Sequence, residues 1–510
     1  MAFERLFDWL FAPIARLAAA LSDPERRERT AILTLIGYVA IWTLYAVLAK
    51  GSQDIHRDMS ELVAWSREPG LGYAKHPPFG AWLTALWFAL FPVADWSFYL
   101  LAMTASAVAL WFAWRIAGDY LDPEKRVLAL ALLMLVPFFN VLALKMNANT
   151  ILIPLWAATT FCFLRSFERR TAGWAALAGL CAALAMFGKY WSIFLLAGLG
   201  LAAVLDSRRA AYFRSAAPWV TIAVGAAAIA PHLVWLVTHN FEPLSYAFTT
   251  HSDTEDSALW SVVIYLGAAV AYVAVPVLLM LAATRPGGVA LLDLLWPATP
   301  ARQFVVMAYW APLLLPALAA PVLSIGLSSV WSMSALTLMP VVLLSSPLLM
   351  LRRKAMLVAV ATAAVVPLIM VAAAPVIAAR VNGHDLEPAA AHASLLAKRI
   401  EREWRRVTYK PLNAVGGEQD LAFGVAFYLP SRPLAFPAGD FNTTVKLVTP
   451  ARLARGGMAI VCGRSSNPCP TQFGPIAHRS IEVDIARTYR GVTDKPAHYV
   501  ITIIPPAPSD

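Results

Sequence analysis

The segment 58–83, DMSELVAWSREPGLGYAKHPPFGAWL, interrupts a hydrophobic chain with a cluster of reactive side chains. Asp58, Glu61 and Trp65 are spaced i, i+3 and i+7, so a helix over this segment would place all three on one face. A Tyr-Lys-His cluster follows, and two prolines then keep the chain extended. The segment lies between two apolar runs, so the rest of the chain decides whether its acids sit at a membrane surface.

The composition indicates a polytopic membrane protein. The chain has 510 residues, of which 59% are hydrophobic and 14% are charged, whereas soluble domains are about 45–50% apolar and about 25% charged. The net charge is +10. Because Lys and Arg gather in alternate loops, the positive-inside rule explains this charge better than nucleic-acid binding does, and no nucleic-acid partner is expected.

The apolar runs predict about eleven transmembrane helices, since a span needs about 20 residues. The runs are 31–49, 97–117, 126–144, 149–166, 172–188, 190–206, 217–237, 258–283, 303–324, 328–350 and 355–378. The shorter run 79–93 is expected to be interfacial or re-entrant.

Basic loops orient these spans and divide the chain into three parts. Residues 1–30 are predicted to form an amphipathic helix on the cytoplasmic surface. Residues 31–378 form the transmembrane domain, with an outer loop at 50–96. An odd number of spans places 379–510 on the periplasmic or extracellular side, where a charged helix and short β-like runs predict a small α/β domain.

The cysteines and histidines give few signs of a metal site. Cys462 and Cys469 lie in the predicted outer domain, where an oxidising compartment favours a disulfide over free thiols. No histidine lies close to them, and no outer loop has ligand spacing typical of a metal centre. We therefore expect no metal and no cofactor.

Two interpretations of the opening segment remain open from the residues alone. Asp58 and Glu61 are either ordinary surface acids of a solvated helix or groups that take a proton from an acceptor hydroxyl as general bases. Tyr73, Lys75 and His76 offer hydrogen-bond donors to a phosphate or a sugar.

The segment resembles the first outer loop of the polyprenyl-phosphate-sugar glycosyltransferases. These membrane enzymes of the GT-C fold include the protein mannosyltransferase-like group, the lipid A aminoarabinose transferases and the rhizobial galacturonosyltransferases. The matching residues are Asp58, Trp65, Ser66, Gly72, Tyr73, His76, Pro77 and Pro78. The resemblance implies that Asp58 is the catalytic base. An acid often follows that Asp in the family, whereas this chain has Met59, and whether Glu61 substitutes for it is open.

Three further stretches fit the same resemblance. Asn149 stands where the family usually has a second acid, so it is either a sugar ligand or the cap of a helix. Lys189 matches a Lys-Tyr turn and either binds the donor phosphate or anchors a helix end by snorkelling. His232 matches a Pro-His-x-x-Trp stretch and is either a donor ligand or a packing residue.

The resemblance implies an inverting transferase of the cell inner membrane. It would move a hexosyl or pentosyl group from an outer-leaflet polyprenyl-phosphate donor to a hydroxyl of a lipid, glycan or protein, as in lipopolysaccharide or cell-envelope glycan modification. Asp58 would act as base and Lys189 would stabilise the departing phosphate. A polytopic transporter or flippase, or a GT-C-like protein without activity, is the alternative. The sequence names neither the sugar nor the acceptor.

Overall fold

A computed structural model describes residues 2–252, 257–382, 384, 386–437, 449–464 and 478–507. The chain forms two compact units. The first, here called the helical unit, comprises Met1–Thr43, Gly70–Gly80 and Leu100–Ile369. The second, here called the sheet-bearing unit, comprises Leu44–Pro69, Ala81–Tyr99 and Met370–Asp510. The second unit thus joins parts of the outer loop to the C-terminal part of the chain, and the predicted domain bounds stay a prediction.

Among the described residues, seven helices are long and apolar enough to cross a membrane. They are α2 (Arg27–Ala49), α5 (Asp95–Tyr120), α7 (Ala148–Arg169), α11 (Ala217–Thr238), α13 (Ala258–Thr284), α15 (Pro300–Leu323) and α17 (Arg353–Asn382). Large apolar side chains such as Ile222, Val270 and Val322 are exposed on them, as expected for helices that face lipid. The prediction of an all-α membrane protein is confirmed.

Four shorter apolar segments complete the hydrophobic helices, so the predicted count of eleven full spans is not confirmed. They are α4 (Phe79–Leu90), α8 (Ala172–Gly188), the pair η2 (Tyr190–Ser192) and α9 (Ile193–Leu205), and the pair η3 (Ser329–Leu338) and α16 (Met339–Leu344). The remaining helices of the helical unit are α1 (Ala2–Ser22), α6 (Pro123–Met134), η1 (Pro137–Phe139), α10 (Arg209–Phe213), α12 (Glu242–Ser252) and α14 (Gly288–Leu295).

The predicted span at 126–144 is wrong as a single helix. Helix α6 ends at Met134, and a 3₁₀ turn begins at Pro137 because proline has no N–H to continue the helical pattern. The amide of Asn140 donates to the carbonyl oxygens of Met134 and Val136, each at 3.0 Å. These side-chain bonds satisfy carbonyls that the lost helical turn leaves without partners.

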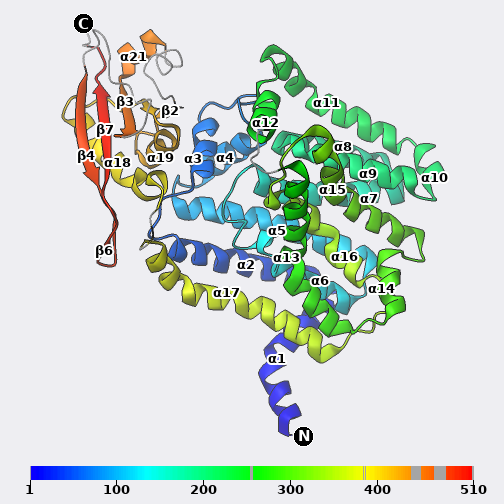
Figure 1. Cartoon of the computed structure of the whole chain (residues 1–510). Helices are drawn as coiled ribbons and strands as arrows, with labels where there is room; N and C mark the ends of the chain where they lie inside the picture. Colours follow the sequence, from blue (N-terminus) through cyan, green and yellow to red (C-terminus); the bar gives the residue numbers. More distant parts are fainter. Residues whose placement is uncertain are drawn as a thin grey trace. The chain divides into compact units, whose positions relative to one another are not determined.

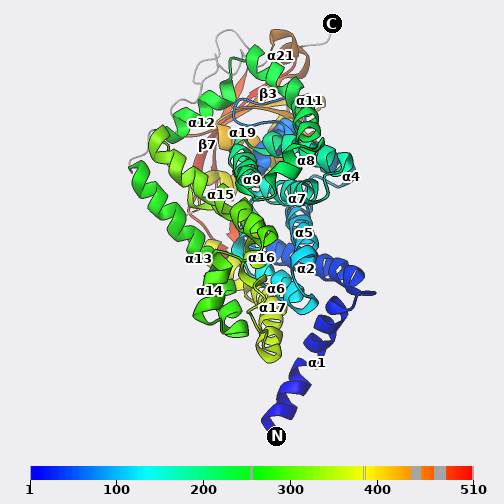
Figure 2. The ribbon, with the colours of Figure 1, turned by 90° about the vertical axis from the view of Figure 1, so that its right-hand side faces the viewer.

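Helix α8 lies beside α11, and α9 lies beside α15 (Figures 1 and 2). Small residues set how closely these helices pack. At Gly179 of α8, an added Cβ would lie 2.3 Å from the carbonyl oxygen of Thr221 in α11. The hydroxyl of Thr221 also donates to the carbonyl of Ala175 across this contact, at 3.0 Å. At Gly198 of α9, an added Cβ would lie 2.6 Å from the ring of Pro312 in α15. Close backbone approach at small residues is typical of helix packing in membranes.

The sheet-bearing unit contains the predicted α/β domain. Its five-stranded sheet has the order β2-β1-β3-β7-β4, with β1 parallel to β2 and β3, and β7 antiparallel to β3 and β4 (Figure 1). The strands are β1 (Ala414–Gly417), β2 (Leu434–Pro437), β3 (Met458–Gly463), β4 (Arg479–Ile485) and β7 (Ala497–Ile504), and the pair β5 (Thr488–Tyr489) and β6 (Val492–Thr493) forms a hairpin. The unit's other helices are α3 (Arg57–Ser66), α18 (Pro388–Arg405), α19 (Gln419–Tyr428) and α21 (Pro450–Gly456).

Two helices cover one face of this sheet. Helices α18 and α19 bury Leu396, Trp404 and Val425 against inward-facing residues of the strands, such as Val461 and Ile501. Helix α3, which comes from the outer loop far earlier in the sequence, packs on α19. The loop helix that carries the predicted catalytic acids is therefore part of the C-terminal domain's hydrophobic structure.

We expect Gly179→Ala to destabilise the helical unit, because its methyl group would overlap backbone atoms of α11. Overpacking of this kind costs about 1–3 kcal/mol. The melting temperature of the detergent-solubilised protein should fall, as measured by scanning fluorimetry. Gly173→Ala in the same helix is the matched control, because nothing lies within 4 Å of an added Cβ there. Equal melting temperatures for the two variants would contradict the close contact.

Candidate functional site

Helix α3 forms as the spacing of its acids predicts. Its N-cap is His56, whose Nδ1 accepts a hydrogen bond from the backbone N–H of Asp58 at 3.1 Å. Asp58, Glu61 and Trp65 are all only partly buried, whereas Met59, Ser60, Leu62 and Val63 between them are buried. The predicted shared face of the three residues is confirmed, and it is the open face of the helix.

The opposite face of α3 fixes the helix in place. Met59, Leu62 and Val63 are each at most 5% exposed and lie on the side that packs against the sheet-bearing unit. The guanidinium of Arg67 donates to the carbonyl oxygens of Pro433 and Ala426 at the end of the helix. An acid in place of Met59 would be buried among apolar side chains, so the second carboxylate of the open face is Glu61.

The Asp58 carboxylate has weak electrostatic partners within its own unit. Its Oδ1 lies 3.8 Å from Nε of Arg57, but that guanidinium donates to Asp420 at 3.1 Å. Nδ1 of His56 lies 3.6 Å from the same oxygen, yet it accepts from the Asp58 N–H and so carries no proton toward the carboxylate. A general base takes a proton from the acceptor hydroxyl, and that role of Asp58 stays a prediction.

The segment Gly70–Gly80 belongs to the helical unit and is fixed there by hydrogen bonds. The hydroxyl of Tyr73 accepts from the Gly70 N–H at 3.0 Å, and the Tyr73 N–H donates to the carbonyl of His76 at 3.1 Å. Gly72 lies so close to the ring of Trp235 in α11 that an added Cβ would be 2.3 Å from it. Glycine is therefore required where the loop crosses this tryptophan.

His232 of α11 is hydrogen-bonded to the same segment. Its Nδ1 lies 2.6 Å from the carbonyl oxygen of Leu71, so this nitrogen is the donor, and its Nε2 lies 3.0 Å from the hydroxyl of Tyr190. Both ring nitrogens are engaged, which favours the packing interpretation of His232. A contact between His232 and the donor stays a prediction.

Two other predicted donor ligands lie near one aromatic ring. The ammonium of Lys75 is 5.9 Å from the ring centroid of Tyr246 in α12, and His76 meets the same ring edge-on at 6.4 Å. Such cation–π contacts stabilise a charge by only about 0.5–1 kcal/mol at exposed sites. Binding of the donor by Lys75 and His76 stays a prediction.

Lys189 occupies the connection between α8 and η2. Its Nζ donates to Oδ1 of Asn149 at 2.7 Å and lies 4.5 Å from the ring centroid of Trp331. Burial lowers the pKa of this ammonium to about 7, since a less polar environment disfavours the charged form. The partner is a neutral amide, so neither contact cancels the positive charge.

The helix-cap interpretation of Asn149 is wrong. The cap of α7 is Asn147, whose Oδ1 accepts from the backbone N–H groups of Asn149 and Thr150 in a capping box. Asn149 lies in the first helical turn, and its side chain points to Lys189 instead. The structure thus brings two of the predicted donor residues together.

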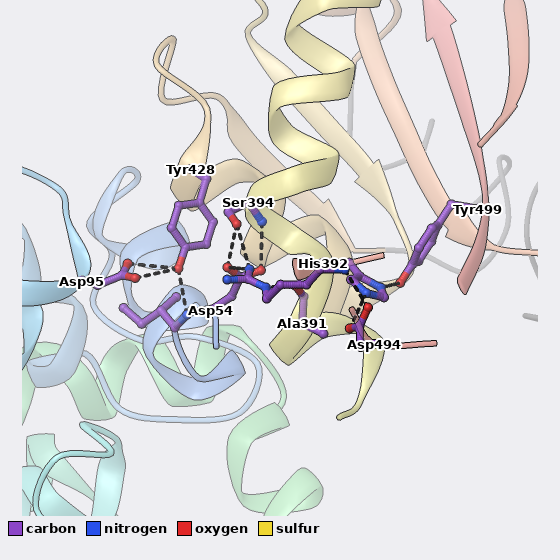
Figure 3. A network of polar contacts seen from close by, with 10 residues as sticks. Asp54, Asp95, Ala391, His392, Ser394, Tyr428, Asp494 and Tyr499 are labelled. Carbon is purple, nitrogen blue, oxygen red and sulfur yellow. Dashed lines mark hydrogen bonds and ion pairs between the residues drawn. The ribbon is translucent and has the colours of Figure 1, made fainter. Parts of the chain in front are cut away.

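Sequence reasoning missed a buried polar network in the sheet-bearing unit (Figure 3). Asp54 precedes α3, and its carboxylate accepts from the guanidinium of Arg487 and from the hydroxyl and N–H of Ser394 in α18, at 2.7 and 3.0 Å. The Asp54 N–H donates to the carbonyl of Ala390 at 2.7 Å. The side chain of Asp54 is only 3% exposed, so this ion pair lies in the interior.

The network continues from the ion pair in two directions. On one side, the hydroxyl of Tyr428 donates to the carboxylate of Asp95 at 3.0 Å and accepts from the Ile55 N–H at 2.8 Å. On the other side, the ring nitrogens of His392 contact the Tyr499 hydroxyl at 2.7 Å and the Asp494 carboxylate at 3.1 Å. The outer loop, the start of α5 and the C-terminal domain are joined in this way.

The remaining predictions concern cysteines and metals. Cys462 lies in β3, but Cys469 lies outside the described residues, so their disulfide stays a prediction. Cys162 and Cys181 are free thiols in α7 and α8, with their sulfur atoms 3.9 Å apart. Within the part of the chain that the structure describes, no group of three or more His, Cys, Asp or Glu residues could hold a metal ion.

The chain is similar in sequence and in fold to known membrane proteins. The sequence model of the family described as dolichyl-phosphate-mannose-protein mannosyltransferase matches residues 75–235. Crystal structures of ArnT from Cupriavidus metallidurans, bound to undecaprenyl phosphate and in the apo state, align over 92% of this chain with TM-scores of 0.64 and 0.61. The alignments cover 97% of the undecaprenyl phosphate-bound ArnT chain and 98% of the apo chain, each at 12% sequence identity.

This chain has the GT-C fold. The lipid A galacturonosyltransferase RgtD of Rhizobium johnstonii is 25% identical over 234 residues, or 46% of this chain. The match spans about half the length of that protein, 47%. The three similarities together support the resemblance to the GT-C glycosyltransferases, and the matched segment 75–235 includes Lys75, His76, Asn149, Lys189 and His232.

We expect Arg487→Met to lower the free energy of unfolding by about 3–5 kcal/mol, because it leaves the Asp54 carboxylate buried without its cation. Unfolding of the purified protein would be followed by circular dichroism during heating. The double variant Asp54→Asn with Arg487→Met should recover part of the loss, since it removes the unpaired charge. Arg490→Met, an exposed arginine in the β5–β6 turn, is the control. A melting temperature of Arg487→Met equal to that of the control would contradict the role of the ion pair.

Proposed function

We propose that this chain is a membrane glycosyltransferase that uses a sugar linked to a polyprenyl phosphate. The observation that carries the proposal is Lys189, a partly buried cation whose hydrogen-bond acceptor is the neutral side chain of Asn149. An anionic ligand can bind reversibly to a cation held in this way. It does not have to compete with a carboxylate, because the side chain of Asn149 is neutral. A polyprenyl phosphate has the matching charge.

The description of the matched protein family supports the same class of sugar donor. The matched family acts from a dolichyl phosphate-linked mannose according to its description, and one ArnT structure holds undecaprenyl phosphate. Both are polyprenyl phosphates. The descriptions of the family and of RgtD are those of transferases, which favours a transferase over the transporter alternative.

We infer that Asp58 acts as the general base. The acceptor hydroxyl would give its proton to the Asp58 carboxylate while its oxygen forms a bond to the anomeric carbon. The bond from that carbon to the phosphate oxygen breaks, and the phosphate leaves with the electron pair. Lys189 would stabilise the charge that develops on the phosphate. Attack from the face opposite the phosphate inverts the anomeric centre.

The burial of Met59 weakens the inactive alternative. The missing acid after Asp58 belongs to the packed face of α3, where Met59 is 1% exposed. A carboxylate there could not reach a substrate without leaving the hydrophobic core. The open face still carries two acids, and we propose that Glu61 orients the acceptor or assists Asp58.

A lipid acceptor has the most support. RgtD is described as acting on lipid A, and the acids of α3 lie in a loop between apolar helices. Because that relative is matched over only half its length, the acceptor remains a proposal here. We propose the outer face of the inner membrane as the place of reaction, with the N-terminus in the cytoplasm, since the basic loops favour that orientation.

We expect Asp58→Asn to reduce sugar transfer by about 10²–10⁴-fold, the usual contribution of a general base. The assay supplies radiolabelled undecaprenyl-phosphate sugars to membranes and follows the label into lipid and polysaccharide fractions. Glu61→Gln should lower transfer less. Glu68→Gln is the matched control, because Glu68 is an exposed acid of the same loop that pairs with Arg452. Transfer by Asp58→Asn at the wild-type rate would refute its role as base.

The protonation of Lys189 predicts how the rate of sugar transfer depends on pH. A donor phosphodiester keeps one negative charge from pH 6 to 9, and kcat/KM reports the pKa of the free enzyme. Transfer at low donor concentration should therefore fall as the pH rises through about 7, where Lys189 loses its proton.

The variant Asn149→Asp tests this assignment. A carboxylate beside Lys189 favours the charged ammonium, so the fall should move to higher pH. The same carboxylate competes with the donor phosphate, so kcat/KM at pH 6 should drop by about tenfold, mostly through KM. Asn149→Ala should leave KM closer to that of the wild type. An unchanged pH profile in Asn149→Asp would exclude Lys189 as the titrating group.

A further inference from the structure

We propose that a cavity in the sheet-bearing unit binds the anionic saccharide head group of a membrane lipid. The cavity has a volume of about 590 Å³, within the range of about 300–1,000 Å³ in which proteins hold small ligands. Its lining includes Lys50, Asp54, Asp95, Trp96, Tyr428 and Arg432. None of these residues has a role in the transfer step described above.

The wall of the cavity combines aromatic surface with fixed polar groups. Trp96 is 44% exposed, and Tyr99 and Phe427 also line the cavity. The exposed ring of Trp96 is a flat surface of the kind that can cover the apolar face of a sugar ring, whereas Tyr99 and Phe427 are each only 4% exposed. The Tyr428 hydroxyl and the Asp95 carboxylate, already held together by a 3.0 Å hydrogen bond, lie beside them. Donors and acceptors in fixed positions next to aromatic rings are what a polyhydroxylated ligand requires.

The charges of the lining favour an anion. Two of its acids have partners, since Asp54 pairs with Arg487 and Asp95 accepts from Tyr428. Lys50 and Arg432 add two exposed cations, and the ammonium of Lys50 donates to the neutral side-chain amide of Gln53 at 3.4 Å. The cavity therefore carries a net charge of +1, from three cations and two acids. A phosphate or carboxylate on the sugar would meet Lys50 and Arg432.

The elements that form the cavity indicate a lipid as the source of the sugar. Lys50 directly follows α2, and Asp95 begins α5, two helices long and apolar enough to span a membrane. Residues at the ends of such helices lie at the depth of lipid head groups. The Asp54–Arg487 ion pair fixes two of the lining residues without any ligand. If the proposed transferase activity holds, the bound head group belongs to the acceptor.

The first test measures binding without any donor, so it does not depend on transfer. Full-length protein in nanodiscs of zwitterionic lipid is dialysed to equilibrium against radiolabelled glucose 6-phosphate, with glucose and inorganic phosphate as separate competitors. We expect saturable binding of the sugar phosphate, with competition by glucose or phosphate alone at least about tenfold weaker. Dodecyl glucoside 6-phosphate, placed in the nanodisc, should compete at least about tenfold better than the soluble sugar phosphate.

The second test removes the two cations. Lys50→Gln with Arg432→Gln should weaken binding of glucose 6-phosphate by about tenfold or more, since the charge-assisted hydrogen bonds of both cations to the phosphate are lost. Arg464→Gln is the matched control, because its side chain is 62% exposed in the same unit and does not line the cavity. Asp58→Asn should bind as the wild type does, even where transfer is lost.

Three outcomes would overturn the proposal. The first is the absence of saturable binding by the wild type, and the second is equal binding by the Lys50/Arg432 double variant and the Arg464 control. The third is equal competition by the soluble and the lipid-linked sugar phosphate, which would exclude a membrane lipid as the source. Loss of transfer with intact binding would instead count against the proposed function alone.

Discussion

The buried ion pair between Asp54 and Arg487 is the constraint on which the sheet-bearing unit depends. A charge with a 3% exposed side chain cannot remain in the interior without a partner, so the outer loop must meet the turn that carries Arg487. Ser394 completes the set of donors to Asp54 from α18. Once the loop is fixed there, α3 follows directly in the chain and lays Met59 and Leu62 against the domain. The orientation of Asp58 is a consequence of that anchoring.

In the helical unit, polar side chains lie among apolar helices, and each is held by specific partners. His232 uses both ring nitrogens to tie the loop at Leu71 and the hydroxyl of Tyr190 together. Lys189 keeps one neutral partner and one aromatic ring. The contrast is informative, because the histidine is fully occupied whereas the lysine retains a charge that a ligand can use.

Much of this arrangement could be predicted from local patterns. The length and hydropathy of the apolar runs identified the long helices, and the i, i+3, i+7 spacing placed Asp58, Glu61 and Trp65 on one face of α3. Patterns failed where a local conformation competes with a helix. Pro137 and the side chain of Asn140 ended the run at 126–144 after α6, and composition alone does not distinguish such a break from a continuous span. The cap of α7 was misplaced by two residues for a similar reason, since Asn147 and Asn149 are the same residue type.

Contacts between distant parts of the sequence were beyond prediction. Asp54 looks like any loop acid until Arg487 and Ser394, more than 300 positions later, fold against it. The packing of α3 on α19 was likewise not predictable from local patterns. Because of this packing, residues after 378 help to hold the helix that carries the Asp58 carboxylate. A stop codon soon after residue 378 would spare Asp58, Lys189 and the other catalytic and donor-binding residues predicted from the sequence, yet it would leave the inner face of α3 in water. Nonsense mutations in the last quarter of the reading frame should therefore be as damaging as those near its start.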